Sequence, residues 1–500
     1  MDKRATATVN GRTLNVKFGA FLSELISGHL PCGGHGNCGK CKVIAHGTLS
    51  PLSDNEKKHL TADEIALGVR LSCCTQVLGD CEIKTLNGNE KSKILTSTDS
   101  IGPSGALSFK NYGAAIDIGT TTLAAKLYST DGRALSDAAR LNPQSRFGAD
   151  VISRIEASIK GNGKAISECI LAAIDEMLCE LAVGAGITAA EIDSVVITGN
   201  TAMLHLLTNT SPEPLSHAPF RAERLFGETL TAQKLGLVAV GKDTEVYLPP
   251  CISAFVGADT VCAILASGMS KKDEPSLLTD IGTNGEMALW KNGSLTVCST
   301  AAGPAFEGVG ISMGMRGSVG AIDKVVLQNG KPFAHVIGDV PPVGICGSGL
   351  VDAIACLLLN ETLDETGYLD DDTAEIAHPV VLTQQDIRMV QLAKSAICAG
   401  IKTLMHNTKT EADGISVFYL AGGFGSYLDI KNAGRIGLVP EELTDKVSVI
   451  GNAALTGASM LLLDKDLRTD AASLSKNVNV ADLATDPFFA EEYMTGMLFE

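Results

Sequence analysis

Short apolar runs that end in glycine-rich loops alternate along most of this chain with longer stretches in which apolar residues recur at helical spacing. The short runs lie at residues 114–116, 195–197, 277–279 and 418–421. Helical spacing is clearest at residues 151–159, 350–359, 387–404 and 453–463. Strands that alternate with helices in this way predict a sheet covered by helices, so we expect an α/β body beyond residue 110.

The first ninety residues follow a different pattern. Strand-like runs at residues 6–9 and 13–16 flank Asn10-Gly11, a favoured two-residue turn of β-hairpins. Residues 21–26 predict a short amphipathic helix, and Thr61-Ala62-Asp63-Glu64 fits a capping box at the start of another helix. We therefore expect a small α+β domain, the head, at residues 1–90.

A polar stretch separates these two regions. Residues 91–110 are rich in Ser, Thr, Gly and Pro, which predicts a flexible linker. The predicted order is the head at 1–90, the linker at 91–110 and the body at 111–500. A chain of 500 residues is too long for one hydrophobic core, which agrees with this division.

Composition and charge narrow the classes of function. The net charge of −17 disfavours nonspecific binding to nucleic acid or anionic membranes, because both require clustered positive charge. The N-terminal residues lack the apolar core of a signal peptide, and no apolar stretch approaches the ~18 residues of a membrane span, so we expect a cytoplasmic protein. In that compartment the 14 cysteines predict metal ligands or packed thiols rather than disulfides.

One loop occurs twice in the predicted body. The segments are Asp117-Ile118-Gly119-Thr120-Thr121-Thr122 and Asp280-Ile281-Gly282-Thr283-Asn284-Gly285. Glycine permits a tight turn after the strand, so that amide N–H groups and hydroxyls can face phosphate oxygens. Each leading aspartate is then placed to hold Mg²⁺ through water. A single copy would be ordinary turn chemistry, but the duplication predicts one nucleotide held between two related halves.

Further glycine clusters follow the loops. Gly347, Ser348 and Gly349 open a predicted helix, whereas Gly422, Gly423 and Gly425 end a predicted strand. A strand that stops in glycine lets the backbone approach a ring or ribose where a Cβ would collide. We therefore expect both clusters to contribute to the nucleotide site.

Several polar residues near these loops have alternative roles. Glu286 and Glu307 are candidates to orient the water that attacks the nucleotide, together with Asp117 and Asp280 as catalytic carboxylates. Beside its Gly-Pro turn, however, Glu307 could instead cap the backbone. Asp259 could be a helix N-cap, and Asn200 could contact phosphate or close a turn.

The head contains a cysteine cluster. Cys32, Cys38 and Cys41 lie in a glycine-rich loop, and Cys73 follows about thirty residues later. Three close thiolates plus one distant one suit a [2Fe–2S] cluster, since positive φ values at glycine let the loop wrap around it. Zinc held by His35 and three cysteines is the alternative. We expected Cys73 and Cys74 to lie in a strand and point to opposite faces, which would leave Cys74 as a packing residue.

These motifs carry two resemblances. The head resembles the adrenodoxin-like [2Fe–2S] ferredoxins, whose fold is a β-grasp, although its loop is one residue longer than plant-type spacing. The body resembles the actin, Hsp70 and sugar-kinase ATPases, which are duplicated α/β proteins of ribonuclease H-like fold. That resemblance implies that Asp117 and Asp280 organise Mg²⁺, that the threonine loops hold phosphates, and that Gly422 to Gly425 contact adenosine.

Across nearly its full length the chain resembles the reductive activators of corrinoid-dependent methyltransferases. Residues 142–144, 148–155 and 420–425 look like that family in particular. The resemblance implies an enzyme that uses ATP, Mg²⁺ and a [2Fe–2S] cluster to reduce the Co(II) corrinoid of a partner protein to Co(I). It also implies an external low-potential electron donor, and it leaves a homodimer open. The alternatives are a small-molecule kinase and a nucleotide-binding regulator, each with a redox-sensing head.

Overall fold

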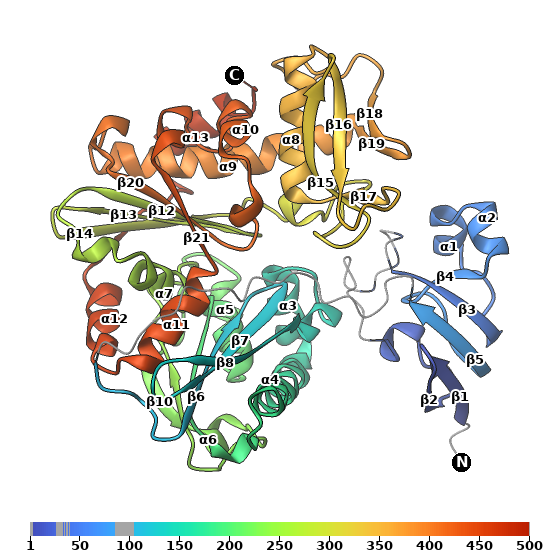
Figure 1. Cartoon of the computed structure of the whole chain (residues 1–500), viewed down its shortest axis with the longest axis horizontal. Coiled ribbons are helices and arrows are strands. Elements are labelled where there is room, and N and C mark those ends of the chain that lie inside the picture. Colours follow the sequence, from blue (N-terminus) through green and yellow to red (C-terminus); the bar gives the residue numbers. More distant parts are fainter. Residues whose placement is uncertain are drawn as a thin grey trace.

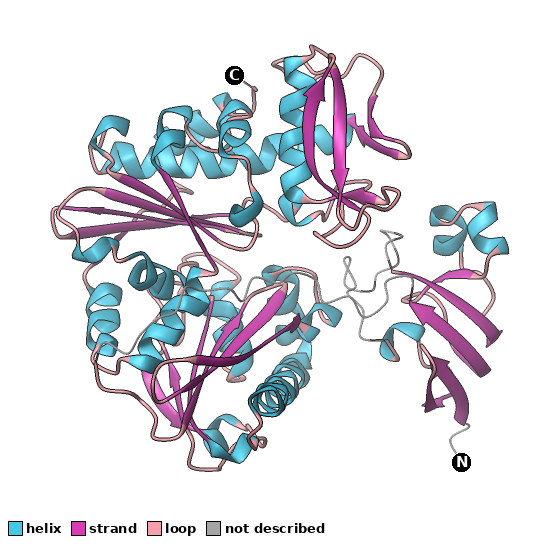
Figure 2. Ribbon diagram, viewed as in Figure 1, coloured by secondary structure: helices cyan, strands magenta, loops and turns pink. Residues whose placement is uncertain are grey.

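The computed structural model describes residues 4–26, Gly34, Gly36, Gly39, 41–85 and 105–499. In these ranges the strands form a five-stranded sheet, two six-stranded sheets and two smaller sheets. Figures 1 and 2 show the large sheets with helices on their faces. Among the described helices, none combines the length and hydropathy that a membrane crossing requires.

The N-terminal sheet is mixed and has the order β2-β1-β5-β3-β4. Its strands are β1 (Arg4–Val9), β2 (Arg12–Lys17), β3 (Lys42–Leu49), β4 (Val69–Leu71) and β5 (Val77–Thr85). The β1–β2 hairpin turns at Asn10 and Gly11 with φ values of 47° and 83°, as the predicted turn requires. Strand β1 pairs in parallel with β5, whereas the other pairs are antiparallel. This α+β sheet agrees with the β-grasp prediction.

Short helices lie beside this sheet. They are η1 (Leu22–Glu24), α1 (Asp54–His59) and α2 (Ala62–Ala66). The predicted capping box is present, because the amide of Thr61 donates to the Glu64 carboxylate at 2.9 Å and the amide of Glu64 donates to Thr61 Oγ1 at 3.2 Å. The helix predicted at residues 21–26 is only the single turn η1. The amides of Leu22 and Ser23 donate to carbonyls of the segment 72–75, so tertiary contacts fix this turn.

The two six-stranded sheets share one plan. The first has the order β10-β11-β9-β6-β7-β8 and the second the order β21-β20-β12-β13-β14-β22. In each, three consecutive antiparallel strands are followed by two strands parallel to the first of them. The predicted duplication is therefore a feature of the fold. The strands are β6 (Tyr112–Ile118), β7 (Thr122–Ser129), β8 (Ala134–Leu141), β9 (Ile192–Gly199), β10 (Glu228–Thr231), β11 (Glu245–Leu248), β12 (Ser276–Ile281), β13 (Gly285–Lys291), β14 (Ser294–Thr300), β20 (Val417–Ala421), β21 (Val447–Gly451) and β22 (Val478–Val480).

Helices cover both faces of these sheets. All four stretches with helical spacing form helices, namely α3 (Val151–Ala157), α8 (Gly347–Leu359), α9 (Gln384–Asn407) and α11 (Ala453–Leu463). The remaining helices are α4 (Gly163–Ala185), α5 (Thr201–Leu207), α6 (Ala232–Leu235), α7 (Ala258–Ser267), α10 (Ile430–Arg435), α12 (Leu467–Lys476) and α13 (Pro487–Thr495). Helices α7 and α11 lie between the two sheets (Figure 1), whereas α4 covers the outer face of the first sheet and α9 that of the second.

The two central helices cross at very short range. A Cβ added to Gly457 in α11 would lie 2.0 Å from the carbonyl oxygen of Cys262 in α7. Only glycine therefore permits this backbone contact. The contact joins the halves, because α7 follows the first sheet and α11 follows the second.

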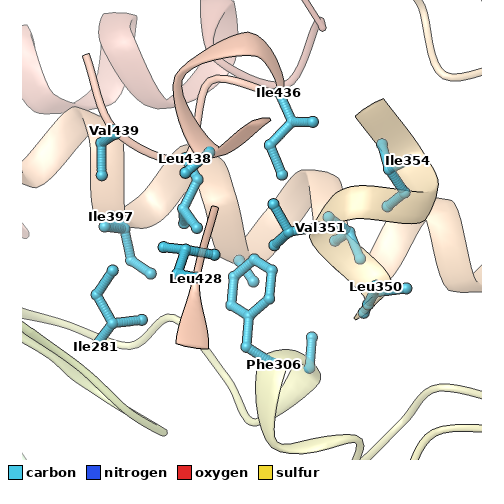
Figure 3. Close-up of a cluster of buried hydrophobic side chains, with 14 of the residues drawn as sticks. Ile281, Phe306, Leu350, Val351, Ile354, Ile397, Leu428, Ile436, Leu438 and Val439 are labelled. Atoms are coloured by element: carbon cyan, nitrogen blue, oxygen red, sulfur yellow. The ribbon is translucent and has the colours of Figure 1, made fainter. Parts of the chain in front are cut away.

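A small subdomain is inserted in the second half. Strands β15 (Ala321–Gln328), β16 (Lys331–Val336) and β17 (Gly344–Ile345) pack on α8, and β18 (Thr373–Ala377) pairs with β19 (Val380–Thr383). The core beneath it reaches the second loop. Figure 3 shows Ile281 and Phe306 among side chains of this core, so the neighbours of Asp280 and Glu307 are tightly packed.

The described part of the predicted linker, residues 105–110, contacts the body. The amide and hydroxyl of Ser108 both donate to the carbonyl of Leu462, at 3.1 and 2.8 Å, and the amide of Lys465 donates to the carbonyl of Ala106 at 2.7 Å. Residues 91–104 lie outside the described ranges. The domain bounds remain a prediction.

Candidate nucleotide site and thiol pair

The two repeated loops close in the same way. In the first, the amide of Gly119 donates to the carbonyl of Thr122 at 2.9 Å; in the second, the amide of Gly282 donates to the carbonyl of Asn284 at 3.0 Å. Each loop joins the first strand of its sheet to the next, so Thr122 begins β7 and Gly285 begins β13. The structure thus places the predicted phosphate loops at equivalent positions in the two halves.

The segment after β8 supports the first loop. The side-chain amide of Asn142 donates to the carbonyl of Gly119 at 2.8 Å, and its backbone amide donates to the carbonyl of Thr121 at 2.9 Å. Asn142 is fully buried. Residues 142–144, which carried part of the family resemblance, therefore hold the loop in place.

A single carboxylate joins the two loops. Thr121 donates to Oε2 of Glu307 at 2.5 Å, and Thr283 donates to Oε1 at 2.6 Å. Glu307 thus accepts hydroxyl hydrogen bonds from both halves rather than capping the backbone. The side chain lies between the two predicted phosphate loops, which fits the predicted role of orienting water. That role itself remains a prediction.

Four acidic side chains gather at the base of the loops. They are Asp117, Asp259, Asp280 and Glu286, and the last two face each other across β12 and β13. Burial raises the pKa of Asp117 to about 8, and the neighbouring Asp259 and Asp280 carboxylates add to this effect. Burial and Asp259 raise the pKa of Asp280 to about 7. Such crowded carboxyl groups suit a hydrated divalent cation, which prefers oxygen ligands and would offset their repulsion.

The structure bears on two alternatives from the sequence. Gly257 is the N-cap of α7, and Asp259 lies in the first turn with its carboxylate accepting from the amide of Thr260 at 2.8 Å. The N-cap interpretation of Asp259 was therefore wrong. Asn200 closes the turn before α5, because its side chain accepts from the amide of Met203 at 2.9 Å. Its side-chain amide also donates to Thr120 Oγ1 at 3.3 Å, and a phosphate contact by Asn200 remains a prediction.

The two glycine clusters differ in what surrounds them. A Cβ on Gly422, whose φ is 93°, would lie 2.5 Å from a carboxylate oxygen of Asp280, whereas nothing lies within 4 Å of the Cβ position of Gly423. Gly422 therefore approaches the acidic group and Gly423 faces open space, whereas a Cβ on Gly425 would lie 2.9 Å from the side chain of Leu420. The ring of Phe424 stacks on that of Phe306, with centroids 5.1 Å apart.

Packing accounts for the other cluster. A Cβ on Gly347 would lie 2.1 Å from the carbonyl oxygen of Phe306, and one on Gly349 would lie 2.3 Å from that of Ile322. The hydroxyl of Ser348 donates to the carbonyl of Asp323 at 2.9 Å. These contacts seat α8 against β15. A nucleotide contact by these three residues stays a prediction.

A cavity of about 60 Å³ lies between the two loops. It is lined by Thr121, Ala149, Asp150, Thr283, Pro304, Glu307, Val309 and Arg316. Two buried guanidinium nitrogens near Glu307, the Nη2 atoms of Arg316 and Arg154, have no hydrogen-bond partner among the residues that the structure describes. We did not predict either arginine. Arg154 lies in the stretch 148–155 that resembles the family, whereas no motif marks Arg316.

The thiols of Cys41 and Cys73 converge in the head. Their sulfur atoms are 3.1 Å apart, and the sulfur of Cys74 is 3.7 Å from that of Cys73. Strand β4 ends at Leu71, so Cys73 and Cys74 lie in a turn and the predicted alternation along a strand does not apply. A Cβ on Gly36 would lie 2.8 Å from the sulfur of Cys74, which shows that Cys74 packs against the loop.

The described part of the cysteine loop fits a wrapped cluster. Gly34, Gly36 and Gly39 have φ values of 84°, 73° and 65°, as a loop around a metal group requires. Cys32, Cys38 and His35 lie outside the described residues. Within the described ranges, no three His, Cys, Asp or Glu side chains are grouped to hold a metal ion directly. The identity of the metal, iron or zinc, therefore remains a prediction, and so does the set of residues that bind it.

Comparison with known proteins agrees with this architecture. Residues 112–272 match the family described as the RACo middle region, and residues 274–500 match the C-terminal domain of RACo, the ASKHA domain. The chain is 36% identical over 452 residues to a corrinoid activation enzyme, RamQ, of Eubacterium limosum, covering 84% of this chain and 76% of that protein. It is 27% identical over 415 residues to the [Co(II) methylated amine-specific corrinoid protein] reductase of Methanosarcina barkeri, covering 77% and 76%.

A solved structure extends the match to the whole chain. The reductive activator for a corrinoid, iron–sulfur protein covers 99% of this chain and 98% of its own, with a TM-score of 0.71 and 27% identity. Fold and site thus define a two-lobed protein of the actin-like ATPase class. Within that class, the chain belongs to the family of reductive activators of corrinoid proteins.

Proposed function

We propose that this protein is an ATP-dependent reductive activator that passes one electron to the Co(II) corrinoid of a partner protein and restores Co(I). The observation that carries the proposal is the 36% identity to a corrinoid activation enzyme over 84% of the chain. The doubled loop and the converging thiols supply the two chemistries that this activity needs, nucleotide binding and electron transfer. The partner is a corrinoid protein of a methyltransferase system.

In the head, Cys41 and Cys73 would hold a [2Fe–2S] cluster together with Cys32 and Cys38. When bound, the cluster supplies a one-electron carrier whose potential depends on its ligands and on hydrogen bonds to sulfur. The chain contributes a loop with glycines at positive φ and a turn after β4, closed by the amide of Cys74 donating to the carbonyl of Leu71 at 2.9 Å, that holds Cys73. An external low-potential donor must reduce the head again after each transfer.

In the body, Asp117 and Asp280 would hold Mg²⁺ through water. Glycine amides and threonine hydroxyls of both loops would hold the phosphates, and residues 422–425 would hold the adenosine. Glu307 or Glu286 would orient the attacking water. Because Thr121 belongs to the first half and Thr283 to the second, a bound nucleotide would change the contact between the halves.

In such a reaction, ATP can offset the free-energy cost of an uphill electron transfer. An uphill one-electron transfer costs about 1.4 kcal/mol for every ~59 mV, so a gap of a few hundred millivolts requires several kcal/mol. Nucleotide binding can provide this if the ATP state favours the complex in which the corrinoid is more easily reduced, because coupling is differential affinity between states. Closure of the two halves is the change we assign to this coupling.

Three further properties belong to the same proposal. The domains are a head at 1–90, a linker at 91–110 and a body at 111–500. No disulfide joins two of the described cysteines, which suits a reducing compartment and supports a cytoplasmic location. A homodimer remains a prediction that light scattering of the purified protein checks.

The test compares Asp117→Asn and Asp280→Asn with Asp273→Asn, an exposed aspartate outside the site. Reduced protein is mixed with a Co(II) corrinoid protein with and without ATP, and Co(I) is followed by visible absorption. We expect ATP-dependent Co(I) in the wild type and Asp273→Asn alone, with equal cluster signals by EPR in all four proteins. An equal Co(I) yield from the site variants would refute the proposal. Transfer of labelled phosphate to a small acceptor would favour a kinase.

A further inference from the structure

Arg316 is a half-buried cation, and its enclosed Nη2 atom has no hydrogen-bond partner in the described part of the chain. It lies between η7 (Ala305–Glu307) and β15, and its Nη2 is enclosed by the protein. Leaving a charged donor unpaired in the interior costs free energy. Burial lowers the pKa of Arg316, and the nearby Glu307 carboxylate opposes this effect. An anion at this position would satisfy the unpaired donor.

The surroundings of Arg316 specify the kind of anion. The side chain lines the cavity of about 60 Å³ together with Thr121 and Thr283, one from each repeated loop. The lining thus combines two hydroxyl groups with a guanidinium, and these donors suit an oxyanion such as a phosphate group. The threonine hydroxyls can donate to such a group in place of Glu307.

The charges in the cavity point the same way. Asp150 and Glu307 both line it, and two carboxylates would repel an incoming phosphate. Among the lining residues that the structure describes, Arg316 is the cation. In the same described part of the chain, no hydrogen bond joins the Nη2 atom of Arg316 to Glu307. The guanidinium thus has a free nitrogen beside the position that Glu307 now shares with the two threonines.

We propose that Arg316 binds the terminal phosphate of ATP between the two loops. A guanidinium can donate two parallel hydrogen bonds to phosphate oxygens, which a lysine cannot do. Arg316 would also offset the charge of Glu307, so that a carboxylate and the terminal phosphate can share one cavity. This assignment rests on the proposed nucleotide site and adds a residue that distinguishes ATP from ADP.

The experiment measures nucleotide affinity of the full-length chain by calorimetry. Wild type, Arg316→Gln, Arg316→Lys and the exposed control Arg133→Gln are each titrated with ADP and with AMP-PNP. We expect Arg316→Gln to weaken AMP-PNP binding about ten- to hundredfold, the range for a lost charge-assisted hydrogen bond. The ADP affinity of Arg316→Gln should equal that of the wild type. The AMP-PNP affinity of Arg316→Lys should lie between those of the wild type and Arg316→Gln. Arg133→Gln should match the wild type for both ligands.

Equal losses for ADP and AMP-PNP, or no loss for either, would overturn the assignment. If Arg316→Gln does not fold, Arg316→Lys, which keeps the charge, carries the same comparison. A second measurement uses inorganic phosphate, which should raise the ADP affinity of the wild type more than that of Arg316→Lys; no effect on the wild type would also count against the site. Failure of the wild type to bind AMP-PNP would instead reject the proposed function itself.

Discussion

Asn452, at the start of α11, donates a hydrogen bond of 3.2 Å to the carboxylate of Asp117, which lies 335 residues earlier in the chain. The same side chain caps α11, because its Oδ1 accepts from the amide of Leu455 at 2.9 Å. One residue of the second half therefore orients the leading carboxylate of the first loop. The arrangement of Asp117 depends on how the two halves sit together.

Replacement of this amide should impair hydrolysis more than folding. Asn452→Asp keeps an effective N-cap but removes the donor and adds a carboxylate beside Asp117. We expect ATP hydrolysis to fall about tenfold, since a hydrogen bond to a charged group contributes about 1.5 kcal/mol. The unfolding transition should barely change. Asn329→Asp, in an exposed turn, is the control for added charge; equal hydrolysis rates in the two variants would contradict the role of Asn452.

Glu307 provides a second test. Glu307→Gln has the same shape but cannot act as a base, and its amide nitrogen cannot accept from one of the two threonines. If Glu307 orients the attacking water, ATP hydrolysis falls at least about a hundredfold while ATP still binds. Single-turnover hydrolysis and calorimetry separate these effects, with exposed Glu361→Gln as the control. A rate within a few-fold of the wild type would leave Glu286 as the better candidate.

The thiol assignment can be tested with adjacent residues. Cys41→Ser and Cys73→Ser should lose the EPR signal and visible absorption of a [2Fe–2S] cluster, because each removes a ligand. Cys74→Ser should keep both, since Cys74 packs beneath Gly36. Loss of the signal in Cys74→Ser with retention in Cys73→Ser would reverse the assignment. Metal analysis of the wild type decides between iron and zinc.

Glu56 should make the head sensitive to acid. Burial alone would raise the pKa of Glu56, but hydrogen bonds from Arg70, Ser53, Thr75 and Leu71 outweigh it and lower the pKa to about 2. Its stabilising effect is therefore complete above the unfolded pKa of about 4.5 and is lost as the pH falls towards 2. The carboxylate joins Arg70 at 2.8 Å and the amide of Leu71 at 3.2 Å, just before Cys73.

Hydrogen exchange of the full chain measures this local stability. At pH 7 the peptides that cover residues 54–75 should exchange faster in Glu56→Gln than in the wild type. The difference should correspond to a loss of about 2 kcal/mol in the free energy of local unfolding. Peptides of α4, in the body, should be unchanged and act as the internal control. After correction for the pH dependence of intrinsic amide exchange, the protection of the wild-type peptides should be the same at pH 7 and pH 5. Equal protection of wild type and variant at pH 7 would show that the charge of Glu56 is unimportant.

Local signals account for what the sequence could predict. The Asn10-Gly11 turn, the Thr61–Glu64 capping box and the four helical stretches each depend on residues close together in the chain. The duplication was visible because glycine and aspartate mark both loops. Such features need no knowledge of tertiary contacts.

The missed features depend on contacts between distant residues. Glu307 reaches Thr121 across 186 residues, and the pairing of Asn452 with Asp117 spans more. No sequence motif marks Arg316. Its proposed role follows only from the residues that line the cavity with it in the folded chain. The expectation that Cys73 and Cys74 lie in a strand was wrong for a related reason: the chain turns after Leu71, and tertiary contacts decide where a strand ends.

The crossing of α7 and α11 has a mechanical consequence. With backbone touching backbone at Gly457 and Cys262, sliding of one helix over the other would force atoms together. Rotation about the crossing remains free of that obstacle. If the two halves close as proposed, the pair would serve as a pivot, and a slight rotation there would move Thr121 and Thr283 through a larger distance.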